Sequence, residues 1–282
     1  MRSSSLPTAA YGDSAPLETE AMVPPTPVCM SPLLHASACF GSWRALRFLI
    51  NREDALGLAS DAVLTQAFLD LLKDDEIGSS LATQRAFEAK EGADEVPWPA
   101  PASLLEGVTI EGDTALHLLA TYGDGENFLK SAGLIYRSAK HLLVAQNRKG
   151  DSPLHCAARA GRSEMISLLI ALASDESSSG ERLKEVVRME NGHKETALHQ
   201  AIRFGSNHIA ELLMAADSEL ANFPKEGMSP LYLAVFLEQV DTAKSLYRTS
   251  DGNLSYSGPN GQNALHAAVL RSQERNLRDQ KK

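Results

Sequence analysis

Short apolar stretches recur in pairs along the chain, and each pair predicts two helices that fold back on one another. Apolar residues at helical spacing form the second helix in two adjacent copies: Met165, Ile166, Leu168 and Leu169, then Ile209, Leu212 and Leu213. A single pair would leave these side chains in water, whereas burying each Leu or Ile stabilises a protein by about 1.5–3 kcal/mol. The pattern therefore predicts an all-α stack in which each pair packs on its neighbours.

A six-residue motif opens each pair, and it ends in Leu-His or a close variant. Its final residues are His117, His155, His199, Tyr232 and His266, and a degenerate earlier copy ends at His35. The last two intervals are 33 and 34 residues, and insertions lengthen the earlier ones. A period of about 33 residues with Thr-Pro-Leu-His-x-Ala is the ankyrin signature. The sequence thus predicts an ankyrin-repeat solenoid of stacked helical hairpins with short loop fingers.

The residues around each first helix have physical reasons to be there. Thr, Ser or Asn precedes the helix and is expected to cap its free N–H groups, and Pro153 and Pro230 fit the first helical position. Gly161 and Gly205 permit the positive φ that ends a first helix. Glu238 stands where the fifth copy should have that glycine.

The repeats suggest a division of the chain into five parts. Residues 1–29 are rich in Ser, Pro and Ala and are predicted to be a disordered leader. Residues 30–51 form a degenerate first repeat, and residues 108–272 form about five more. Residues 52–107 are an acidic insert with 12 acidic and 4 basic side chains, too long for a hairpin connection. Residues 273–282 form a polar tail.

Three segments between or beyond the repeats leave alternatives open. The acidic insert is expected to hold one amphipathic helix that packs on the stack, and the alternative is a partner-docking insert; the expected face is Leu64, Phe68, Leu71 and Leu72. Ser177–Ser179 is expected to be a plain loop, with phosphorylation as the alternative. The tail is either a polar capping helix or the sign of a chain that stops within its sixth repeat, which we favour.

Charge and motifs exclude several classes of function. The net charge is −9, and no cluster of Lys and Arg marks a nucleic-acid site. Four of the eight histidines occupy the same repeat position, where bonding to loop backbone serves the fold. No zinc-protease, P-loop or nucleophile-elbow motif occurs, so we expect no enzyme activity, no catalytic residue, no cofactor and no metal. The partner is expected to be a protein.

The termini and cysteines bear on location. There is no apolar run that could serve as a signal peptide or span a bilayer. The three cysteines are too scattered for a disulfide framework, which favours reduced thiols in the cytoplasm.

Two longer stretches, Leu220–Gly227 and Gly252–Gln262, resemble plant ankyrin-repeat proteins of the accelerated-cell-death type. The resemblance covers roughly residues 30–272. In that family a membrane-spanning PGG domain follows the repeats, and members act in defence, cell-death and stress signalling. The resemblance implies a cytoplasmic protein-binding scaffold in plant defence or stress signalling. The alternative is a fragment or isoform of a multi-pass membrane protein, located at the plasma membrane in a longer form.

Ankyrin repeats in general hold partners by their loop tips and by the exposed end of each first helix. Tyr and Arg at such places often dominate binding energy. Carried onto this sequence, the candidate protein-binding surface is Tyr122, Arg148, Lys149, Asp151, Arg159, His193, Lys194, Arg203, Phe204, Lys225 and Phe236.

Overall fold

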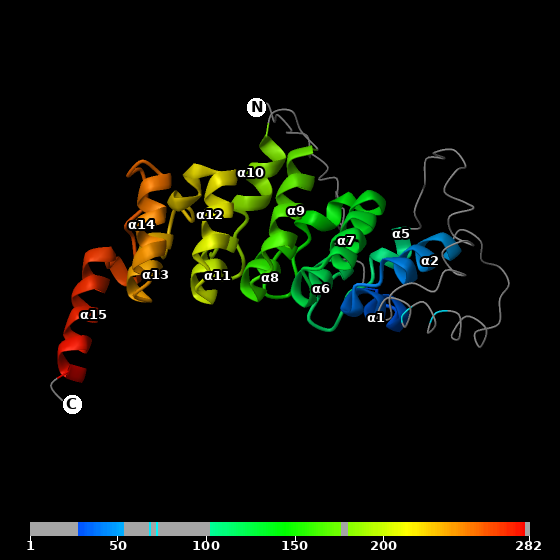
Figure 1. Cartoon of the computed structure of the whole chain (residues 1–282), viewed down its shortest axis with the longest axis horizontal. Helices are drawn as coiled ribbons and strands as arrows, with labels where there is room; N and C mark the ends of the chain where they lie inside the picture. The colour runs from blue at the N-terminus through cyan, green and yellow to red at the C-terminus, as the bar shows by residue number, and fades with distance from the viewer. Residues whose placement is uncertain (1–27, 54–67, 69–71, 73–101, 176–179, 280–282) are drawn as a thin grey trace, which may run out of the picture.

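The computed structural model describes residues 28–53, 68, 72, 102–175 and 180–279. Over these residues the chain is helical, and its only β pairing consists of two isolated bridges. The helices form two rows that run the length of an extended stack (Figure 1). The all-α solenoid predicted from the repeat is the fold observed. The expected leader and most of the acidic insert lie outside the described residues.

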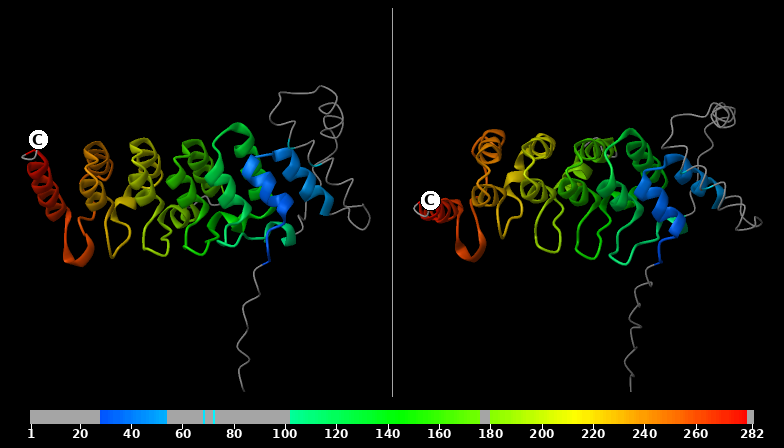
Figure 2. Two further views of the ribbon diagram at one scale, coloured as in Figure 1. Left: turned by 90° about the horizontal axis from the view of Figure 1, so that it is seen from below. Right: turned by 60° about the horizontal axis from the view of Figure 1, so that its bottom comes forward.

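The inner row contains the first helix of each repeat, and each helix packs on the next along the stack. Its members are α1 (Pro32–Phe40), α6 (Ala115–Tyr122), α8 (Pro153–Ala160), α11 (Ala197–Phe204), α13 (Pro230–Phe236) and α15 (Ala264–Asp279). Loops extend from one side of this row as parallel fingers (Figure 2).

The outer row contains the second helices, which also pack in sequence order. They are α2 (Trp43–Glu53), α7 (Glu126–Ser138), α9 (Ser163–Asp175), α12 (Asn207–Ala216) and α14 (Val240–Thr249). Shorter elements complete the stack: α5 (Ala102–Leu105), α10 (Glu181–Arg188), and the 3-10 helices η1 (Lys140–Val144), η2 (Ser218–Asn222) and η3 (Pro259–Gly261).

The ends of the inner helices follow the predicted chemistry. Thr114, Ser152 and Thr196 cap α6, α8 and α11, and a histidine three residues later completes each capping box. Gly161 ends α8 in the left-handed conformation, with φ +74°. In the fifth copy Glu238 adopts the same conformation, with φ +60°, although its side chain disfavours it.

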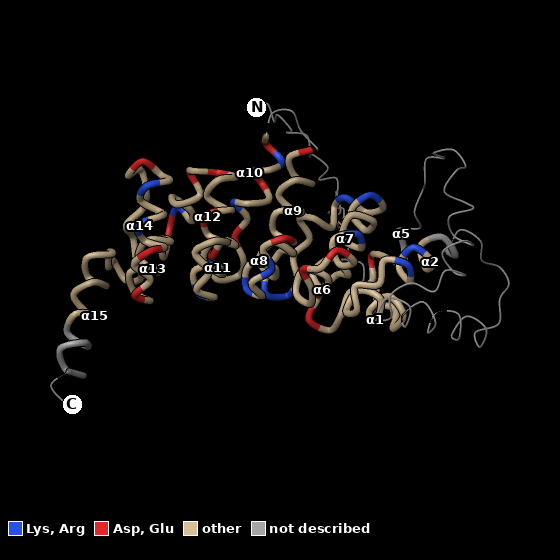
Figure 3. The backbone as a smooth tube through the Cα atoms, viewed as in Figure 1, with Lys and Arg blue, Asp and Glu red and all other residues tan. Residues whose placement is uncertain are grey.

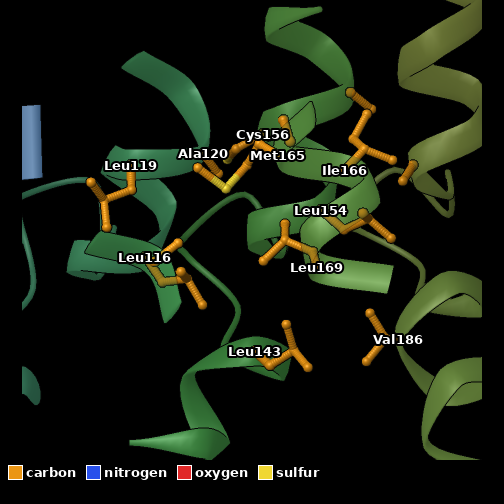
Figure 4. Packing of buried hydrophobic residues seen from close by; sticks show 14 of the residues in the cluster. Leu116, Leu119, Ala120, Leu143, Leu154, Cys156, Met165, Ile166, Leu169 and Val186 are labelled. Atoms are coloured by element: carbon orange, nitrogen blue, oxygen red, sulfur yellow. The ribbon is translucent and has the colours of Figure 1, made fainter. Parts of the chain in front are cut away.

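The core lies between the two rows. Met165, Ile166 and Leu169 of α9 are buried against Leu154 of α8, as the helical spacing predicted (Figure 4). Leu168 is only partly buried and packs against this core. Since buried apolar residues form one continuous cluster along the stack, each repeat depends on its neighbours for stability.

The first repeat joins the second across the acidic insert. The backbone N–H of Met30 donates to the Val108 carbonyl at 2.9 Å, and α1 packs on α6. Of the helix expected within the insert, Phe68 and Leu72 are described; both are helical, and Phe68 is buried in the core. Leu64 and Leu71 lie outside the described residues.

Two segments that were expected to be a loop and a polar tail contain helices. After the insertion at Ser177–Ser179, which lies outside the described residues, the chain forms α10. Arg188 at its end pairs with Asp217 at 2.5 Å and with Glu219 at 2.7 Å. At the other end, α15 continues past Ser272 to Asp279, so the expected polar tail begins within a helix. Across the part of the chain that the structure describes, none of the helices combines the length and the hydropathy that a membrane span requires.

Candidate protein-binding surface

The repeated histidines hold one finger to the next. The Nε2 atoms of His117, His155 and His199 lie 2.8–2.9 Å from the carbonyl oxygens of Asp151, Glu195 and Met228 respectively. The Nδ1 atom of each ring accepts from the backbone N–H of its helix-capping residue at 3.2 Å. Because Nδ1 is an acceptor, the proton must be on Nε2. The predicted bond to loop backbone is present at three of the four motif histidines, whereas the ring of the fourth, His266, bonds to Asn263 of its own copy.

Burial keeps these three rings neutral. It lowers the pKa of His117 and of His155 below the ordinary 6.5, and it lowers the pKa of His199 to about 4. A protonated ring would place an uncompensated charge in the core and would lose the hydrogen bond that Nδ1 accepts. The histidines are therefore parts of the scaffold and are not free to act in chemistry at the surface.

Two asparagines shape the central fingers, which we call finger 147–151 and finger 191–195. The side-chain oxygen of Asn147 accepts from the backbone N–H groups of Lys149 and Asp151 at 2.9 and 3.0 Å. Asn191 makes the equivalent bonds to His193 and Glu195 at 2.9 and 3.1 Å. Each finger is thus closed by its own asparagine, and its tip residues have a fixed place.

The fingers are also joined to each other. The Gly192 N–H donates to the Lys149 carbonyl at 2.9 Å, and the Arg148 N–H donates to the Glu111 carbonyl at 3.0 Å. The Asn191 side chain donates to Asp151 at 2.8 Å. Adjacent fingers therefore form a continuous and ordered edge.

Two arginines at the ends of inner helices face these fingers. Arg159 of α8 pairs with Asp151, and Arg203 of α11 pairs with Glu195, each at 2.5 Å. The arginine side chains are 46% and 45% exposed, whereas those of Asp151 and Glu195 are 2% and 8% exposed. Each pair therefore hides its carboxylate and presents its guanidinium to solvent.

The two carboxylates stay ionised because of these contacts. Burial alone would raise the pKa of Asp151, but hydrogen bonds from Arg159 and Asn191 hold that pKa below its ordinary value. For Glu195, Arg203 outweighs burial in the same way and lowers the pKa. Both carboxylates thus carry a negative charge that orients a specific arginine.

A cavity of about 390 Å³ lies between finger 147–151, finger 191–195 and the two arginines. Five of the eleven predicted surface residues line it: Lys149, Asp151, Arg159, His193 and Arg203. Figure 3 shows Lys and Arg gathered in the fingers beside α8. The remaining six predicted residues do not line it. Arg148 and Lys194 are exposed on the same two fingers, and four lie elsewhere along the row: Tyr122, Phe204, Lys225 and Phe236.

Asp151 requires a correction. The sequence places it at a finger tip available to a partner, but its side chain is buried at the base of the finger. It accepts hydrogen bonds from Arg159 and Asn191, which leaves it no role in direct contact. Its effect on the surface is to orient Arg159.

Sequence reasoning missed Asn147 and Asn191, which order the fingers, and Gln200, which lines the cavity. Gln200 donates to Glu195 at 3.0 Å and so helps to hold the second carboxylate. A signal for the asparagines was present, because each lies eight residues before the motif histidine of its copy. No corresponding signal marks Gln200. Among the described residues there is also no group of His, Cys, Asp and Glu that could hold a metal ion.

Aromatic residues flank the cavity along the inner row. Tyr122 and Phe204 are more than half exposed at the ends of α6 and α11. Phe236 of α13 stacks on Tyr232, and the Arg271 guanidinium lies 4.3 Å from the Phe236 ring centre. The face thus presents exposed arginines and aromatic residues, which are residue types enriched at protein interfaces.

Comparison with known proteins supports the repeat assignment. Residues 172–256 match the family described as ankyrin repeats in three copies, and residues 149–176 match a single ankyrin repeat. The chain is 32% identical over 154 residues to Protein ACCELERATED CELL DEATH 6 of Arabidopsis thaliana. It is 29% identical over 133 residues to the Nuclear factor NF-kappa-B p105 subunit of Rattus norvegicus.

These similarities cover part of each protein. The Arabidopsis match includes 51% of this chain and 22% of the relative, and the rat match includes 46% of this chain and 13% of the relative. The chain therefore spans less than a quarter of the length of these relatives. Within this chain, residues 149–256 match ankyrin repeats and form part of the helical solenoid.

Proposed function

We propose that this chain is a protein-binding scaffold that holds its partner on the finger surface, which we define as the fingers together with the exposed ends of α6, α8, α11 and α13. Ankyrin repeats are protein-interaction modules, and neither matching family indicates catalysis. The single observation that carries the proposal is the ordered row of fingers beside half-exposed arginines and aromatic rings. Such a pre-formed surface loses little conformational entropy when a partner binds.

The wider setting is also a proposal. Similarity to Protein ACCELERATED CELL DEATH 6 favours a role in plant cell-death or defence signalling over the other contexts in which ankyrin repeats occur. The three cysteines are all free, which favours a reducing compartment such as the cytoplasm.

Affinity capture from cells that express the chain tests the scaffold function. We expect Phe204→Ala to lower recovery of the partner by roughly tenfold, because aromatic residues at protein interfaces often contribute strongly to binding. Tyr247→Ala is the matched control, since Tyr247 is similarly exposed but lies on α14 of the outer row. Equal recovery with both variants, at unchanged helical circular dichroism, would rule out the finger surface.

A further inference from the structure

The cavity between finger 147–151 and finger 191–195 has an excess of positive charge. Lys149, Arg159 and Arg203 line it, together with the carboxylates of Asp151 and Glu195. Arg148 and Lys194 add two exposed cations at the finger tips. The lining of the cavity thus holds three cations and two carboxylates, which leaves it one positive charge in excess.

The two carboxylates do not cancel this charge at the surface. Both are buried and accept hydrogen bonds from inside the protein, Asp151 from Asn191 and Glu195 from Gln200. Arg159 and Arg203 each pair with one of these carboxylates, while nearly half of each arginine side chain faces solvent. An incoming ligand therefore meets positive groups first, and those groups are already oriented.

The positive region has clear limits. The preceding finger presents Glu111 and holds the half-buried Asp113, and the following finger presents Glu226 beside Lys225. A nucleic acid needs a longer run of cations, because its affinity arises from many phosphate contacts. Carboxylates on both sides would repel its backbone, so a short ligand with a few negative charges fits this surface better.

The surroundings also favour a peptide over a small anion. Phe204, at the end of the same helix as Arg203, presents an aromatic ring that is 55% exposed. The ring lies against the backbone of Gly161 and bridges α8 and α11. A segment of chain can place carboxylates in the cavity and an apolar side chain on this ring at the same time.

We propose that this cavity binds the carboxylate side chains of an acidic peptide segment in the protein partner. The inference rests on the proposed scaffold function and names the chemistry of the segment that the scaffold holds. Arg159 and Arg203 would contact carboxylates of the peptide through their exposed N–H groups. Lys149 and Lys194 would contact further carboxylates from the two fingers. Binding should weaken as NaCl is raised, because these contacts are partly exposed to solvent.

A direct binding experiment tests the proposal with a defined probe. A fluorescein-labelled peptide of alternating Glu and Ala is titrated with the full chain, and fluorescence anisotropy gives Kd. We expect the peptide with Gln in place of Glu to bind about tenfold more weakly or not at all. We expect the double variant Lys149→Glu, Lys194→Glu to lose the Glu peptide to a similar degree. These side chains project from the finger tips, so the fold should be retained.

The matched control is the double variant Lys184→Glu, Lys244→Glu, which makes the same change in net charge on α10 and α14. It should bind the Glu peptide like the unmodified chain. Equal loss in both double variants, or equal binding of the Glu and Gln peptides, would overturn the proposal. It would also be overturned if labelled single-stranded DNA bound as tightly with the same dependence on Lys149 and Lys194.

The outcome is separable from that of the scaffold function. If the Glu peptide fails to bind while capture of a protein still depends on Phe204, the acidic-segment proposal is wrong and the scaffold function stands. If capture does not depend on Phe204, the scaffold function through this surface is wrong, whatever the peptide does.

Discussion

At the scale of single residues, the motif histidine links sequence to structure most directly. Its place in the repeat predicted a bond to loop backbone, and the ring has that bond in three copies. The burial of Asp151 could not be predicted from its position in a loop. It depends on Arg159, eight residues later, and on Asn191 of the next finger, so it follows from how two repeats pack.

The neutral histidines predict a loss of stability in mild acid. Their pKa values are lower in the folded chain than in the unfolded chain, so the unfolded chain binds more protons below about pH 6.5. Stability is fully present above that pH and is lost as the pH falls toward the folded pKa. For His199, with a pKa of about 4, the loss at pH 5 is roughly 2 kcal/mol.

Urea unfolding between pH 7 and pH 5 measures this effect. The window stays above the ordinary pKa values of Asp151 and Glu195, whose own contributions are lost only at lower pH. His199→Gln should flatten the dependence on pH, even though it lowers stability at pH 7. An unfolding free energy that is constant from pH 7 to pH 5 would contradict the assigned protonation.

At the scale of elements, helix starts and stops were largely predictable because they depend on local chemistry. Capping residues opened α6, α8 and α11 as expected, and Gly161 ended α8. Helix α10 was not predicted. Arg188, near its end, binds Asp217 and Glu219 and lies 4.7 Å from the ring centre of Phe223, and these partners are far away in sequence.

Two glycine substitutions should act in opposite directions. Gly161→Ala should destabilise the chain by about 1–2 kcal/mol, because the residue has positive φ and the new methyl group would meet the Phe204 ring. Gly133→Ala should stabilise it by about 0.5–1 kcal/mol, because Gly133 lies inside α7 and an added Cβ would meet no atom outside its own helix backbone within 4 Å. Thermal unfolding measures the melting temperature of both variants. A shift of the same sign in both would refute this account of the two glycines.

At the scale of the whole molecule, the repeat period alone indicated the solenoid. It did not indicate which surface residues come together, because the cavity depends on the packing of two fingers from neighbouring repeats. Five of the predicted residues meet there, while Tyr122 and Phe236 lie apart along the row. Sequence gives the order of the repeats, whereas the contacts between them give the site.

Because the repeats share one core, shortening a single buried side chain should destabilise the whole stack. Leu213 of α12 is fully buried, so Leu213→Ala should cost about 2–5 kcal/mol through lost burial and the resulting cavity. Leu265→Ala is the control, because Leu265 is 72% exposed on α15, and it should change stability by less than about 0.5 kcal/mol. The urea concentrations at the midpoint of unfolding are compared between the two variants. Similar small shifts in both would mean that the repeats do not depend on one another.

The central claim is that a protein partner lies on the finger surface. Site-specific photocrosslinking tests it most directly: a photoreactive phenylalanine analogue is placed at Phe204 of the inner row or at Tyr247 of the outer row, two similarly exposed positions. Irradiation in cells that express the chain should yield a discrete crosslinked protein from Phe204 and none from Tyr247. Crosslinking from Tyr247 alone, or from neither position, would contradict the account.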